Sequence, residues 1–162
     1  MKAFTDKQCL DTALRLLGRR DHSCLELSQK LKQRGFAPEM IASVIATCVK
    51  MNYLNDKRFC ETYTNQLRRR GYGVMRIGQK LKAKGISAAH IRCSIERYCA
   101  EAAQRDDCQR VIEKKMSAHQ TNEPPEKARA RLFRFLYHRG FSSDIIRQVL
   151  QAAPGLKNDD SI

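Results

Sequence analysis

The sequence predicts an all-α protein made of three tandem three-helix repeats that stack as an elongated, curved solenoid. A sequence pattern recurs along the chain, and apolar residues fall at helical spacing within each copy. The composition agrees with this prediction, because 8 Gly, 4 Pro and 7% aromatic residues provide few of the turns that a sandwich or barrel needs. With 42% hydrophobic and 30% charged residues, the 162-residue chain has the composition of a globular protein.

The repeated pattern is clearest in the middle helix of each predicted repeat. Residues 27–36 match residues 77–86, and each segment is followed by isoleucines at corresponding positions. A third, more diverged copy ends at Arg139-Gly140-Phe141. A single three-helix unit of this length buries little surface, so neighbouring repeats are expected to pack on one another.

Each copy ends in a glycine that predicts the end of a helix, because glycine enters the left-handed conformation without a Cβ penalty. In that motif the residue after the glycine commonly contacts an apolar residue one turn back. The three predicted pairs are Phe36 with Leu31, Ile86 with Leu81, and Phe141 with Leu136.

Helix starts are predicted by capping residues. Ser23 with Glu26 has the spacing of a capping box, and Pro38 suits the first turn of a helix. Asn55, Ser87 and Ser142 can each accept a hydrogen bond from a free N–H group of the following helix.

These signals predict nine helices and their grouping. The predicted helices are 6–19, 23–34 and 38–51, then 56–70, 74–84 and 88–103, then 104–118, 126–139 and 143–153. The repeats are assigned to residues 1–54, 55–101 and 102–153, with a polar loop at 119–125 and a disordered tail at 154–162.

Basic residues dominate the charge, since 31 Lys and Arg against 17 Asp and Glu give a net charge of +14. Such an excess favours nucleic acid or an acidic protein surface as partner. Most runs of charged residues are solvated helix faces. Here, however, the basic residues recur on or beside the middle helix of each repeat. Stacking of the repeats would therefore align them as a continuous basic strip. The candidate partner- or DNA-binding residues are Lys30, Arg34, Arg68, Arg69, Arg70, Tyr72, Arg76, Lys80, Lys84, Arg134 and Arg139.

Catalytic and cofactor-binding residues are not predicted. The seven cysteines lack metal-ligand spacing and are expected to act mainly as small buried hydrophobic residues, and the four histidines and the carboxylates show no catalytic pairing. Gly71-Tyr72-Gly73 lacks the third glycine of a phosphate loop and is expected to join two helices. We therefore expect no enzyme, no cofactor and no metal.

Membrane association is also not predicted. The first residues are charged where a signal peptide is apolar, and no stretch of the sequence is long and apolar enough to span a membrane. The sequence therefore favours a soluble protein of the cytoplasm.

Specific motifs resemble those of the RecX family, the bacterial regulators of the RecA recombinase. They are Arg20-Asp21-His22-Ser23, Tyr53-Leu54-Asn55-Asp56, Arg70-Gly71-Tyr72-Gly73 and Arg134-Phe135-Leu136 followed by Arg139-Gly140-Phe141. Asn55-Asp56 stands where the family often has two acidic residues.

The resemblance implies a cytoplasmic protein of tandem three-helix repeats that lies in the helical groove of RecA filaments on single-stranded DNA. It also implies inhibition of the recombinase, ATPase and co-protease activities of RecA without chemistry by this chain, which we expect to act as a monomer. The alternative is a direct DNA-binding protein that places basic helices on the phosphate backbone of single- or double-stranded DNA.

Overall fold

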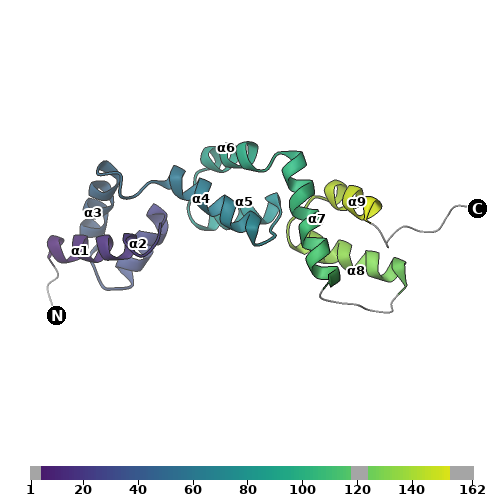
Figure 1. Cartoon of the computed structure of the whole chain (residues 1–162). Helices are drawn as coiled ribbons and strands as arrows, with labels where there is room; N and C mark the ends of the chain where they lie inside the picture. The colour runs from purple at the N-terminus through teal and green to yellow at the C-terminus, as the bar shows by residue number, and fades with distance from the viewer. Residues whose placement is uncertain (1–4, 118–123, 154–162) are drawn as a thin grey trace, which may run out of the picture. The chain divides into compact units, whose positions relative to one another are not determined.

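The computed structural model describes residues 5–117 and 124–153, which form helices joined by short turns (Figure 1). These residues form nine helices and no strand: α1 (Asp6–Leu17), α2 (Cys24–Lys32), α3 (Pro38–Lys50), α4 (Asp56–Arg69), α5 (Val74–Ala83), α6 (Ala88–Tyr98), α7 (Glu101–Ser117), α8 (Pro125–His138) and α9 (Ser143–Ala152). The predicted all-α class is confirmed. Stacking of the repeats as a curved solenoid stays a prediction. The predicted tail at 154–162 and most of the loop predicted at 119–125 lie outside the described residues.

The predicted helix ends are confirmed in their backbone geometry. Gly35, Gly85 and Gly140 have positive φ angles of 86°, 76° and 90°. After each glycine the next residue donates its N–H to the backbone carbonyl of the apolar residue with which the sequence analysis paired it. The N–H of Phe141, for example, lies 3.3 Å from the Leu136 carbonyl.

The helix starts agree with the predicted caps, with one difference. The hydroxyl of Ser23 accepts from the Glu26 N–H at 3.1 Å, and Asn55 and Ser142 cap α4 and α9 in the same way. The carboxylate of Glu26, however, contacts basic side chains rather than completing a capping box.

The boundary between α6 and α7 differs from the prediction. We expected one helix to run to residue 103 and the next to begin at 104, but α6 ends at Tyr98 and α7 begins at Glu101. The side-chain amide of Gln104 donates to the Cys99 carbonyl at 2.8 Å, which satisfies a carbonyl freed by the end of α6.

The chain divides into two compact units, with boundaries that fall inside α4, α5 and α6. Unit 1 contains the residues up to Thr62 and Leu81–Ile91, and unit 2 contains Tyr63–Lys80 and the residues from Arg92 onward. The core of unit 1 is formed by Cys9, Ala13, Leu16, Leu27, Leu31, Phe36, Ile41, Val44, Cys48 and Leu54. The core of unit 2 includes Cys108, Ile112, Leu132, Leu136, Phe141, Ile145, Ile146, Val149 and Leu150.

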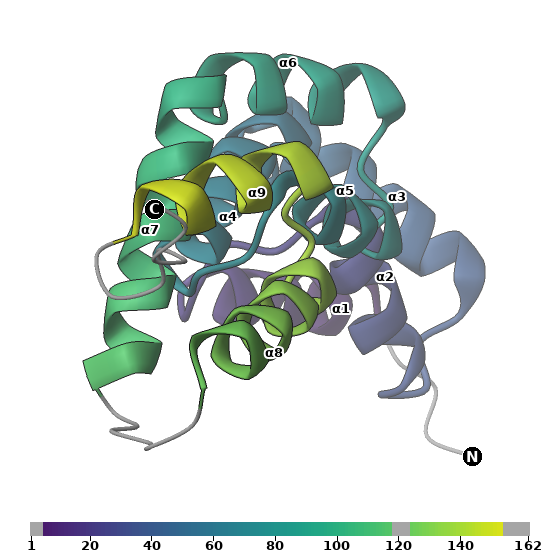
Figure 2. The same ribbon diagram turned by 90° about the vertical axis from the view of Figure 1, so that its right-hand side faces the viewer.

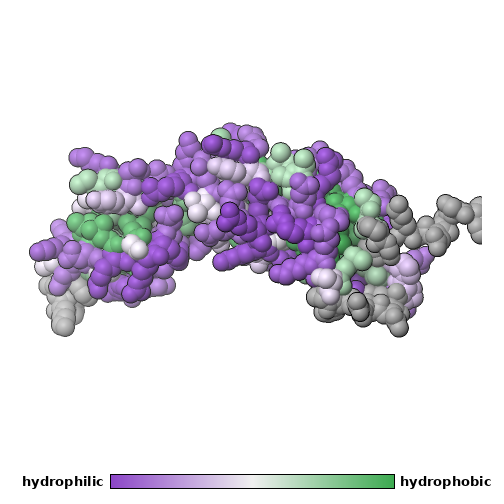
Figure 3. Space-filling view, in the orientation of Figure 1, coloured by the Kyte–Doolittle hydropathy of each residue, from purple (hydrophilic) through white to green (hydrophobic). Residues whose placement is uncertain are grey.

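Helix packing in unit 2 is visible in Figure 2, where α9 lies against α7 and against α8. All three helices contribute apolar residues to the core of unit 2, as amphipathic helices do when they pack on one another. At the surface, Figure 3 shows hydrophobic residues over α1 and α3 and a mainly hydrophilic surface over α4 and α5.

Five of the seven cysteines are buried, as expected for small apolar residues, and all seven are free. Burial raises the pKa of the Cys108 thiol to about 12 and that of Cys99 to about 11, so both are protonated at neutral pH. Among the described residues, none of the helices combines the length and apolar character that crossing a bilayer requires.

Candidate functional site

The turn after α4 contacts the turn after α8, and this contact organises the basic residues of unit 2. The N–H of Gly73 donates to the Arg139 carbonyl at 2.9 Å, and the N–H of Met75 donates to the Gly140 carbonyl at 3.1 Å. A Cβ atom at Gly73 would lie 2.3 Å from the Gly140 carbonyl oxygen, and one at Gly140 would lie 2.4 Å from the backbone nitrogen of Arg76. Glycine is therefore required on both sides of the contact.

Arg139 is fixed across this contact. Its Nη1 donates to the Arg70 carbonyl at 2.7 Å, and its guanidinium lies 5.4 Å from the ring centre of Tyr72 and 5.0 Å from that of Phe135. The ammonium of Lys80 lies 4.9 Å from the Tyr72 ring. The predicted residues Tyr72, Lys80 and Arg139 thus form one cation–π cluster, in which Tyr72 is half-buried and its ring already holds two cations.

Arg68 has an internal partner. Its Nε lies 2.7 Å from a carboxylate oxygen of Asp107, which is buried and also pairs with Arg110. The hydrogen bond to Asp107 raises the pKa of Arg68. A buried carboxylate needs such partners, so Arg68 joins α4 to α7 within the molecule.

Arg69 and Arg70 are exposed and lie at the rim of a pocket of about 450 Å³ in unit 2, which we call the basic pocket. Its lining contains six cationic side chains and no acidic one: Arg69, Arg70, Arg110, Lys114, Lys115 and Arg139, with Gly71, Val111 and Phe135 completing the wall. Such a concentration of positive charge favours phosphate or carboxylate groups.

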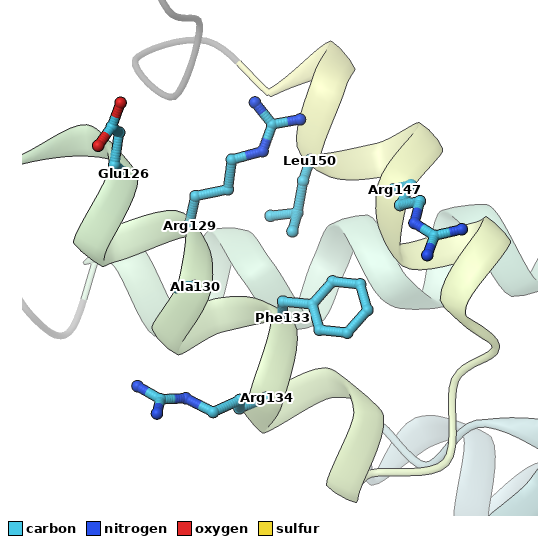
Figure 4. Close-up of a pocket in the computed structure, with 7 residues that line it drawn as sticks. All are labelled: Glu126, Arg129, Ala130, Phe133, Arg134, Arg147 and Leu150. Carbon is cyan, nitrogen blue, oxygen red and sulfur yellow. The ribbon is translucent and has the colours of Figure 1, made fainter.

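The remaining predicted residues of unit 2 lie outside the basic pocket. Arg76 is exposed, and its guanidinium donates to the Gln79 side chain at 3.1 Å. Arg134 borders a shallow groove between α8 and α9 (Figure 4). In that view Phe133 and Leu150 point into the space between the two helices, whereas the guanidinium of Arg134 extends away from it.

Two of the three predicted residues of unit 1, Lys30 and Lys84, lie around Glu26, an acidic residue that was predicted only as part of a helix cap. Glu26 Oε1 lies 2.6 Å from Arg20 Nη2, 3.2 Å from Lys84 Nζ and 3.9 Å from Lys30 Nζ. The structure therefore brings together basic residues from the middle helices of the first two repeats, but Lys30 and Lys84 share an internal carboxylate. Arg34 is exposed and donates to the Lys30 carbonyl.

The Glu26 cluster is strongly coupled. Burial alone raises the pKa of Glu26, but hydrogen bonds from Arg20 and Lys84 outweigh this effect and lower the pKa to about 2. Nearby, Ser23 donates its hydroxyl proton to the Lys84 carbonyl at 2.7 Å. The cluster thus connects α2 to the end of α5 within unit 1.

Sequence reasoning missed three residues of the basic pocket, namely Arg110, Lys114 and Lys115 of α7. These three residues lie on the first helix of the third repeat, whereas the predicted residues of that repeat, Arg134 and Arg139, lie on or beside its middle helix. The i, i+4 spacing of Arg110 and Lys114, which places both on one helical face, was the available signal.

Three family models describe this chain in order. They are the first three-helix domain of RecX at residues 9–48, the second at 55–93 and the third at 104–150. The fold prediction of three tandem three-helix repeats is therefore confirmed.

Relatives and solved structures give the same result. The chain is 37% identical over 144 residues to "Regulatory protein RecX" of Vibrio vulnificus, covering 88% of this chain and 90% of the relative. It is 37% identical to the same-named protein of Pseudomonas tolaasii over 86% and 87% of the two chains. The crystal structure of RecX from Lactobacillus salivarius matches with a TM-score of 0.78 and 21% identity, covering 91% of this chain and 95% of that one. The chain therefore belongs to the RecX family of regulatory proteins.

Proposed function

We propose that this protein regulates RecA in the cytoplasm by binding in the helical groove of the RecA filament. Binding would inhibit the recombinase, ATPase and co-protease activities of RecA without any chemistry by this chain. The observation that carries the proposal is the match, over most of both chains, to relatives named as regulatory proteins.

The exposed basic residues of unit 2 supply a physical basis for binding. Arg69, Arg70 and Arg76 project from the end of α4 and the start of α5, which Arg139 holds in place from the end of α8. Rim charges of this kind accelerate association with an acidic partner, and their effect is screened by salt. Inhibition should therefore weaken as ionic strength increases.

Titration of the DNA-dependent ATPase of RecA with this protein tests the proposal. Arg76→Glu should raise the concentration needed for half-inhibition roughly tenfold, because it replaces an attractive charge with a repulsive one. Glutamate is favourable in the first turn of α5, so the helical circular dichroism should not change. The matched control is Arg92→Glu, which makes the same charge change at an exposed position of α6 in unit 2.

Two outcomes contradict the proposal. Absence of inhibition by the unsubstituted protein would reject RecA regulation. If Arg76→Glu and Arg92→Glu weaken inhibition of the ATPase equally, the surface that contains Arg76 is not the contact with RecA, and the effect is one of overall charge.

Direct binding to DNA is the second candidate, and the net charge of +14 is the observation that favours it. This function requires tight binding to naked DNA at physiological salt, with a steep dependence of affinity on salt and no need for RecA. Naked-DNA affinity in the micromolar range or weaker would favour the RecA regulator.

A further inference from the structure

We propose that the basic pocket binds a compact polyphosphate group, such as the triphosphate of a nucleotide. The inference goes beyond the proposed function, because this ligand would bind the protein in the absence of RecA and DNA. It rests on the charge, rigidity and size of the pocket.

Charge identifies the class of ligand. The six cationic side chains come from three segments: the end of α4, the exposed face of α7 and the end of α8. One of them, Arg110, shares Asp107 with Arg68, and Asp107 is buried behind it rather than in the lining. The pocket therefore carries a large uncompensated positive charge, which a ligand with several adjacent negative charges would neutralise.

Two cations of the pocket are held in place before any ligand arrives. Arg139 is fixed by the carbonyls of Arg70 and Gly71 and by the ring of Phe135. The ammonium of Lys115 lies 5.3 Å from the centre of the same ring. Side chains that are already held in place lose less entropy on binding a ligand than mobile side chains do. The smaller entropic cost favours a specific site over a diffuse cationic surface.

Size favours a compact ligand over a nucleic acid strand. The volume of about 450 Å³ lies within the range of small-molecule sites. Phosphates of a polyphosphate chain are joined by bridging oxygens, whereas those of a nucleic acid strand are separated by sugars. A polyphosphate therefore brings more negative charge into this volume, and its oxygens can accept paired hydrogen bonds from guanidinium groups.

Isothermal titration calorimetry of the full-length protein with sodium tripolyphosphate tests the proposal, with inorganic phosphate and a short single-stranded oligonucleotide as comparisons at the same salt concentration. Tripolyphosphate should bind at one site per chain and roughly tenfold or more tighter than phosphate. Lys114→Glu, which reverses a charge in the lining, should weaken that binding about tenfold or more.

The matched control is Lys127→Glu, an exposed lysine of α8 outside the basic pocket, which should change the affinity less than about twofold. Absence of saturable tripolyphosphate binding would overturn the proposal, as would equal weakening by both substitutions. Tighter binding of the oligonucleotide, lost in Lys114→Glu, would assign the pocket to a nucleic acid backbone and also overturn it. None of these results depends on RecA, so failure here is distinct from failure of the Arg76→Glu test.

Discussion

Substitution of Gly140 by alanine tests the contact that organises the basic residues of unit 2. Gly140 has a φ of +90°, and its Cα faces the backbone of Arg76 so closely that a Cβ atom would lie 2.4 Å from that nitrogen. The neighbour is backbone, which cannot rotate away as a side chain could. The two turns must therefore separate to admit a methyl group.

The cost has two parts. An alanine in left-handed backbone costs about 1–2 kcal/mol. Separation of the turns also removes the hydrogen bonds from Gly73 to Arg139 and from Met75 to Gly140, at about 0.5–1.5 kcal/mol each. The expected loss in the free energy of unfolding is about 2–5 kcal/mol.

Gly35→Ala is the matched control, because Gly35 also ends a helix at positive φ but is exposed to solvent. The free energy of unfolding of Gly35→Ala should fall only by the cost of alanine in left-handed backbone, about 1–2 kcal/mol. Urea unfolding followed by far-UV circular dichroism measures both losses. If Gly140→Ala is no less stable than Gly35→Ala, the turn-to-turn contact does not contribute to stability and our reasoning is refuted.

Three further predictions concern buried polar groups. The pKa of Glu26 in the folded protein lies near 2, below its usual value of 4.5. Ionised Glu26 therefore contributes roughly 3 kcal/mol to the free energy of unfolding above pH 4.5, and this contribution is lost as the pH falls toward 2. In Glu26→Gln, acid titrations followed by circular dichroism should lose this part of the pH dependence. Asp107→Asn should cost about 2–4 kcal/mol in urea unfolding, because it removes the buried carboxylate that Arg68 contacts; an unchanged midpoint would show that the pair is not structural. Thr64→Val should cost about 1–3 kcal/mol, because the buried hydroxyl of Ser94 loses its partner at 2.9 Å; a thermal melt that matches the unsubstituted protein would contradict this.

Local residue patterns were sufficient to predict the helices and their ends. A glycine at positive φ or a capping serine acts through hydrogen bonds to residues three to five positions away, so a short window of sequence contains both partners. The largest difference between predicted and observed boundaries is at α6 and α7, where the side chain of Gln104 donates to the Cys99 carbonyl. No glycine or proline marks that position in the sequence.

The amino-acid sequence by itself also determined the excess of basic residues and the family to which the chain belongs. Only the tertiary structure decided which basic side chains pair with a carboxylate inside the molecule and which are exposed to solvent. Arg68 meets Asp107 across 39 positions and Lys84 meets Glu26 in unit 1, whereas Arg69 is left exposed at the basic pocket. The physical reason is that an ion pair depends on the distance between two side chains in space, and neighbours in the sequence do not reveal which distant carboxylate the folded backbone brings within reach.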